Sequence, residues 1–75
     1  MKRIKFVVKV NRSRTLIPAY VRRVEPTPIQ LTTNRKLALL MGRFTAEDAA
    51  RSLQNSQCNA KLEAVGVYVY SANSQ

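Results

Sequence analysis

The residues of this chain best suited to chemistry are its thirteen lysines and arginines. They outnumber the four acidic residues and give the chain a net charge of +9. Ammonium and guanidinium groups bind phosphate oxygens, and a basic surface that meets a polyanion gains free energy by releasing condensed counterions. The chain has no histidine and one cysteine, Cys58. Histidine-containing metal clusters and Ser-His or Cys-His nucleophile pairs are therefore excluded, and we expect no enzyme, metal or cofactor.

The positive charge is concentrated in the first half of the chain. Residues 1–36 carry ten lysines and arginines against one acidic residue, Glu25, whereas residues 37–75 carry three of each sign. The whole excess of positive charge thus belongs to the first half. Such a split is typical of a protein that presents one basic surface to nucleic acid, although a small basic protein can also owe its charge to solubility alone.

Eight basic residues and two tyrosines are the candidate nucleic-acid contacts. The candidate phosphate-binding residues are Lys2, Arg3, Lys5, Lys9, Arg12, Arg14, Arg22 and Arg23. Bases could stack on the rings of Tyr68 and Tyr70. Tyrosine is also favoured on any half-exposed strand, and lysine on an exposed face discourages edge pairing, so sheet structure alone explains the same pattern.

Three strands would position these side chains. Residues 3–10 and residues 61–70 alternate with period two, which is typical of strands with one buried face. Residues 15–25 predict a weaker strand, and Pro18 places it at a sheet edge because proline lacks a ladder donor. The residues expected beneath the helix are Ile4, Phe6, Val8, Val10, Val65, Val67 and Val69. The lysines and the two candidate tyrosines would share the other, open face.

Residues 45–56 predict the principal helix. Thr45 is expected to cap its first turn, with Glu47 and Asp48 placing negative charge near the free backbone N–H groups. Phe44 is expected to be a large apolar contact beside the cap. The alanines of this segment would allow the helix to approach a sheet closely.

The fold class predicted from these elements is α+β, in a single small basic domain of 75 residues with a frayed tail at 71–75. The sheet would be three-stranded and mainly antiparallel, with order 2-1-3 and element order β-β-α-β. Residues 29–43 allow a short strand at 29–32 and an extra short helix that is capped by Thr33 or Asn34 and ends at Gly42. The longest apolar runs are short, so we expect a cytoplasmic protein with no membrane partner.

The segments Phe44-Thr45-Ala46-Glu47-Asp48-Ala49 and Leu62-Glu63-Ala64-Val65, with Ala38 before them, resemble small proteins encoded by tailed phages and prophages. Those proteins often have the order strand, strand, helix, strand, with the helix opening on the pattern F-T-x-E-x-A. The resemblance covers roughly residues 20–67. It implies a phage accessory role in which the protein binds a host or phage protein, or nucleic acid.

Two functions are compatible with the sequence. The first is a non-catalytic module that binds DNA or RNA, mainly without sequence preference, through its basic half and an open sheet face. The alternative is a phage or prophage accessory protein that binds and modulates a host protein through that face or an edge strand, with the cations steering it to an acidic partner. An open face of this kind could also close a homodimer.

Overall fold

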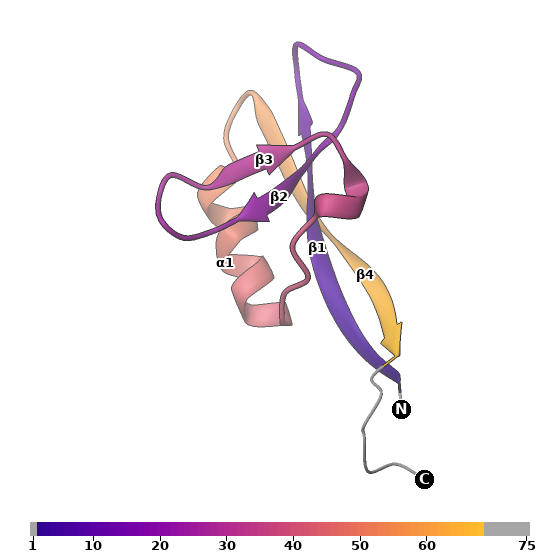
Figure 1. Cartoon of the computed structure of the whole chain (residues 1–75). Coiled ribbons are helices and arrows are strands. Elements are labelled where there is room, and N and C mark those ends of the chain that lie inside the picture. Colours follow the sequence, from indigo (N-terminus) through magenta and orange to yellow (C-terminus); the bar gives the residue numbers. More distant parts are fainter. Residues whose placement is uncertain (1, 69–75) are drawn as a thin grey trace, which may run out of the picture.

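The computed structural model describes residues 2–68, which form a four-stranded antiparallel sheet with one α-helix against one face (Figure 1). The elements are β1 (Lys2–Arg12), β2 (Ala19–Arg23), β3 (Gln30–Thr32), the 3-10 helix η1 (Arg35–Leu37), α1 (Arg43–Leu53) and β4 (Cys58–Tyr68). The strand order is β3-β2-β1-β4. The predicted α+β class is confirmed, and the predicted order 2-1-3 is present as β2-β1-β4.

β1 and β4 pair over their whole length. The antiparallel register runs from Lys2 opposite Tyr68 to Arg12 opposite Cys58 without a break. β2 pairs with β1 only near the C-terminal end of β1. The first half of β1 and the last half of β4 therefore extend past β2 as a two-stranded ribbon (Figure 1).

The core lies between the sheet and α1. Val8 and Val10 of β1 are fully buried on the helix side, as the period-two pattern predicts. α1 buries Ala46, Ala49 and Ala50 against them. Because these side chains end at Cβ, the helix backbone can approach the sheet and the strand valines fill the space between. Ala19, Val21 and Met41 complete the buried cluster.

The predicted start of the helix is wrong. α1 begins at Arg43, its N-cap is Gly42, and no side chain caps it, so Thr45 lies inside the helix. The reason is a tertiary contact, because Met41 exchanges two backbone hydrogen bonds of 2.8 Å with Phe6 of β1. The chain is thereby fixed as an extended segment up to Met41, and the helix starts as soon as it leaves that bridge.

Two further expectations about this helix fail with its start. Phe44 is 82% exposed and makes no large apolar contact with the core. The first turn holds no acidic residue. Glu47 lies 3.4 Å from Arg43 and Asp48 lies 3.6 Å from Arg51, both as ion pairs along the helix surface. Their contribution is that of exposed helix pairs, about 0.3–0.5 kcal/mol each.

The segment between β2 and α1 is largely extended. The predicted short strand is present as β3, with Leu31 opposite Val21, so β2 is an interior strand and not the predicted edge. Pro18 immediately precedes β2, where its missing N–H removes no ladder bond. The predicted short helix is only the single turn η1, in which Asn34 accepts a hydrogen bond from the N–H of Lys36 (3.0 Å).

The predicted phase of the last strand is also wrong. β4 begins at Cys58, and Ala60 and Leu62 pack against the core. Val65 and Val67 stand opposite Lys5 and Arg3, so they lie on the face away from α1 and not beneath the helix. Lys61 and Glu63 share one side of this segment with Val65 and Val67, so that side is charged at one end and apolar at the other, and the pattern alone does not determine which side is buried. Val69 lies outside the described residues.

Replacing Ala46 by leucine should destabilise the fold by about 1–3 kcal/mol, because this fully buried position has no space for three more carbons. Urea unfolding followed by circular dichroism measures the change. The control is Phe44→Ala, which the exposure of Phe44 predicts to stay within about 0.5 kcal/mol of the native protein. A large loss in Phe44→Ala together with none in Ala46→Leu would contradict the described packing.

Candidate functional site

The two sides of the sheet differ in charge. The α1 side carries Arg43 and Arg51, each paired with an acidic residue of the same helix. The opposite side, which we call the cationic face, is defined by Arg3, Lys5 and Lys9 of β1, Lys61 of β4 and Arg35 of η1. Among the described residues, the acidic group on this face is Glu63, and it is bound to Arg35. The cationic face therefore keeps a positive excess, whereas the two arginines of α1 are balanced by two acidic residues.

Lys9 and Lys61 stand directly opposite one another on adjacent strands. Residues in this relation have Cβ atoms about 4.5–5.5 Å apart, and like charges so placed destabilise a sheet. Lys61 is exposed and Lys9 is half-buried. Lys5 and Arg3 continue the row of cations along β1 towards its N-terminal end. A bound anion would remove the repulsion within this row.

The middle of the cationic face is covered. Val7 and Tyr20 are buried on the side away from α1, at 3% and 7% exposure, and η1 packs against β2 there. Nε and Nη2 of Arg35 both donate to Oε1 of Glu63, at 3.2 and 2.8 Å, and this bond raises the pKa of Arg35. The expected open sheet face is therefore divided, and Tyr20 is not available for stacking. The other cations of this face, Arg3, Lys5, Lys9 and Lys61, lie on the paired strands β1 and β4.

The predicted contacts are distributed over three places. Arg3, Lys5 and Lys9 lie together on the cationic face. Arg12 and Arg14 lie at the β1–β2 loop. The last two predicted cations, Arg22 and Arg23, are exposed at a β-bulge at the end of β2. The backbones of Lys2 and Tyr68 belong to the paired strands, but their side chains are not described, and Tyr70 lies outside the described residues.

Three cations on or beside the cationic face were not among the predicted contacts, namely Lys61, Arg35 and Lys36. Lys61 belongs to the half of the chain with no net charge, and only the β1–β4 register reveals its place opposite Lys9. Arg35 and Lys36 are adjacent in the basic half but lie in a segment whose structure the sequence left ambiguous. A strand predicted over residues 58–68 would have been the available signal for Lys61.

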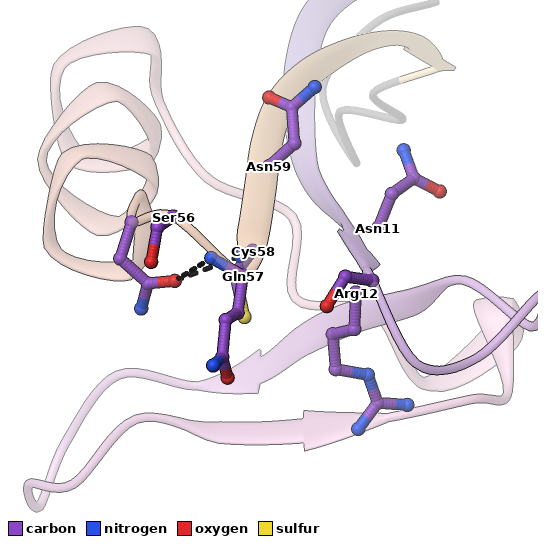
Figure 2. A pocket seen from close by; sticks show the side chains of 8 residues that line it. Asn11, Arg12, Ser56, Gln57, Cys58 and Asn59 are labelled. Atoms are coloured by element: carbon purple, nitrogen blue, oxygen red, sulfur yellow. Dashed lines mark hydrogen bonds between the residues drawn. The ribbon is translucent and has the colours of Figure 1, made fainter.

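A hollow of about 240 Å³ lies between the end of β1 and the turn before β4 (Figure 2). Oδ1 of Asn55 accepts hydrogen bonds from the N–H groups of Gln57 and Cys58, at 2.7 and 2.9 Å, so this side chain holds the turn. Cys58 is a free, half-buried thiol packed against the core. Nε of Arg12 is buried without a hydrogen-bond partner. The hollow is thus a structural feature at the base of the β1–β2 loop.

Within residues 2–68, no group of three or more metal-ligating side chains lies together. None of the helices in the same range has the length and apolar character required to cross a membrane. The arrangement that remains is a set of fixed positive charges on one side of a sheet, which acts on anions through Coulomb attraction and hydrogen bonds.

Comparison with protein-family models, curated proteins and solved structures found no match. The resemblance to phage and prophage proteins thus stays a prediction from the sequence pattern around residues 44–49.

The pairing of Lys9 with Lys61 predicts that reversing the charge of either lysine stabilises the protein. Lys9→Glu and Lys61→Glu should each stabilise the fold, by about 0.2–1 kcal/mol, because each creates an opposite-charge cross-strand pair. The double variant Lys9→Glu/Lys61→Glu should be less stable than either single variant, since it restores a like-charge pair. Urea unfolding of the four proteins measures the cycle. If lower net charge alone were responsible, the double variant would be the most stable, which would contradict the described register.

Proposed function

We propose that this protein is a non-catalytic nucleic-acid-binding module that uses its cationic face and binds mainly without sequence preference. The observation that carries the proposal is the Lys9–Lys61 pair, which places two positive charges side by side within a row of cations. Such a pair destabilises the free protein, because like charges repel. Phosphates that lie across both strands would neutralise the two lysines and so stabilise the complex. The balanced ion pairs of α1 supply no comparable surface on the other side.

The form of the face fits backbone recognition. Its cations stand at intervals along β1, with Lys61 of β4 opposite Lys9. Half-buried Val65 and Val67 of β4 lie opposite Lys5 and Arg3. Lysines in such an array contact phosphates as mobile point charges and do not read base edges, which accounts for the absence of sequence preference. Tyr68 and Tyr70 stay predicted stacking groups from the sequence pattern.

Two pairs of substitutions with equal net charge test the proposal. Lys9→Gln/Lys61→Gln should weaken binding to all sequences and reduce the slope of log affinity against log salt by up to about 1.4–1.8, because two phosphate contacts are lost. Arg43→Gln/Arg51→Gln removes the same charge from the helix side and should leave the slope nearly unchanged. Fluorescence anisotropy with a labelled duplex and a labelled single strand across a salt series measures both.

Equal losses in the two double variants would show that net charge, and not the cationic face, governs binding. No binding by the native protein even at low salt would contradict the proposed function outright. Both double variants are expected to fold, because each neutralises only exposed or half-buried side chains.

The second candidate function is binding of a host protein at a sheet edge, and the edge of β4 is the observation that favours it. β4 is the outermost strand of the described sheet. Phe6 gives its N–H and C=O to Met41, so the backbone groups of Ala64, opposite Phe6, point to the outer edge. The edge is closed only nearer the turn, where the N–H of Ala60 donates to Oε1 of Gln54 (2.9 Å). An extended segment of a partner could add there as a strand.

Ala64→Pro separates this candidate from the first. It removes an outward N–H without removing a bond to β1, so the sheet should persist while strand addition is blocked. A protein captured from nuclease-treated lysate by the native chain, but not by Ala64→Pro, would support the second candidate. Capture that is equal for both variants would exclude strand addition at this edge.

A further inference from the structure

The loop that joins β1 to β2, residues 13–18, projects beyond the sheet (Figure 1). It carries two large exposed apolar side chains, Leu16 with 101% exposure and Ile17 with 60%. Pro18 follows them directly. An isolated exposed apolar residue needs no explanation, but two in sequence on a projecting loop form a small apolar tip.

Hydrogen bonds hold the base of this loop in place. The N–H of Ser13 donates to the carbonyl of Gln57 (2.9 Å), which ties the loop to the turn before β4. Oγ1 of Thr15 accepts from the N–H of Ile17 (3.1 Å), and the N–H of Thr15 donates to the carbonyl of Arg12 (3.3 Å). These bonds make a local turn with Thr15 half-buried. The tip is therefore presented outward by a defined backbone.

The loop is also strongly basic. Arg14 is exposed beside the tip, and Arg12 lies at its base with Nε unpartnered. The sequence contains no acidic residue before Glu25. β1 leads directly from Lys9 of the cationic face into the loop, and Lys9 and Arg14 are separated by roughly 17 Å of extended chain at most. That span is well within one helical turn of duplex, about 34 Å.

The small apolar area of the tip limits the kind of partner that it can bind. A stable protein interface buries about 800 Å² on each side, far more than two side chains provide. Even a whole myristoyl chain gives only marginal membrane binding, so a leucine and an isoleucine are too little for an anchor. One or two apolar side chains flanked by arginines are, however, what a protein needs to enter the minor groove and wedge between base steps.

We propose that Leu16 and Ile17 insert into the minor groove of a nucleic-acid duplex, partly unstack a base step and bend the duplex. Arg14 contacts the phosphates beside the wedge, and the cationic face contacts the backbone further along. The inference rests on the proposed function and deepens it, since it names a deformable double strand as the ligand. Flexible pyrimidine–purine steps should be preferred, because they unstack at least cost.

Bending is tested with a DNA duplex of about three helical turns that carries a donor and an acceptor fluorophore at its ends. The native protein should raise energy transfer at saturation. Leu16→Ala/Ile17→Ala should abolish the rise and lower duplex affinity about tenfold, with the salt slope and the single-strand affinity unchanged, because the phosphate contacts remain. Phe44→Ala is the matched control, since it removes another exposed apolar side chain from a different place and should bend the duplex like the native protein.

Binding without bending by the native protein would overturn the wedge and leave the proposed function in place. Bending retained in Leu16→Ala/Ile17→Ala would overturn it as well. Absence of any duplex binding would instead contradict the proposed function itself. Flotation with vesicles of equal parts phosphatidylcholine and phosphatidylserine provides the remaining comparison: binding to vesicles that depends on Leu16 and Ile17, with no duplex bending, would assign the tip to a membrane surface and overturn the inference.

Discussion

The unbroken pairing of β1 with β4 is the interaction on which the rest of the structure depends. Because successive side chains on a strand point to opposite faces, this one register assigns the described side chains of both strands to the α1 side or to the side of the cationic face. It brings Ala60 and Leu62 beneath α1 together with Val8 and Val10. The same register places Lys61 beside Lys9. A shift of β1 by one residue would bury Lys9 and expose Val8 and Val10. The core and the candidate site are therefore specified by the same backbone contacts.

A second constraint acts where the chain returns to β1. The bridge between Met41 and Phe6 and the hydrogen bond from the N–H of Leu39 to the carbonyl of Val21 (2.8 Å) hold residues 38–41 against the sheet. This extended segment, residues 38–41, places η1 on the side of the cationic face and α1 on the other side of the sheet. The covered middle of the cationic face and the location of the helix are thus consequences of one extended segment.

The sequence predicted those parts of the fold that depend on local pattern. The strand at β1 with Val8 and Val10 on the helix side, the alanine side of α1 and the order of the three main strands are confirmed. Ile4, which was expected beneath the helix, is 55% exposed, and Val7 on the opposite side is buried. The helix start was wrong because the Met41–Phe6 bridge overrides the capping signal of Thr45. The phase of β4 was wrong because Lys61 and Glu63 share a side of the strand with Val65 and Val67, so the local pattern gives two opposite indications. The pairing with β1 selects between them. For the candidate site, charge composition identified Lys5 and Lys9 but not Lys61, whose position follows from pairing across 52 residues of sequence and not from any local property.

Chemical-shift mapping by nuclear magnetic resonance tests the central claim most directly. Addition of a short DNA duplex to the ¹⁵N-labelled protein at low salt should shift the amide signals of β1, of β4 around Lys61 and of the β1–β2 loop, and should leave those of α1 nearly unchanged. The shifts should diminish as salt is raised, because the contacts are with phosphates. Shifts that gather on α1, or no shifts at any salt concentration, would contradict the assignment of the cationic face as the nucleic-acid-binding surface.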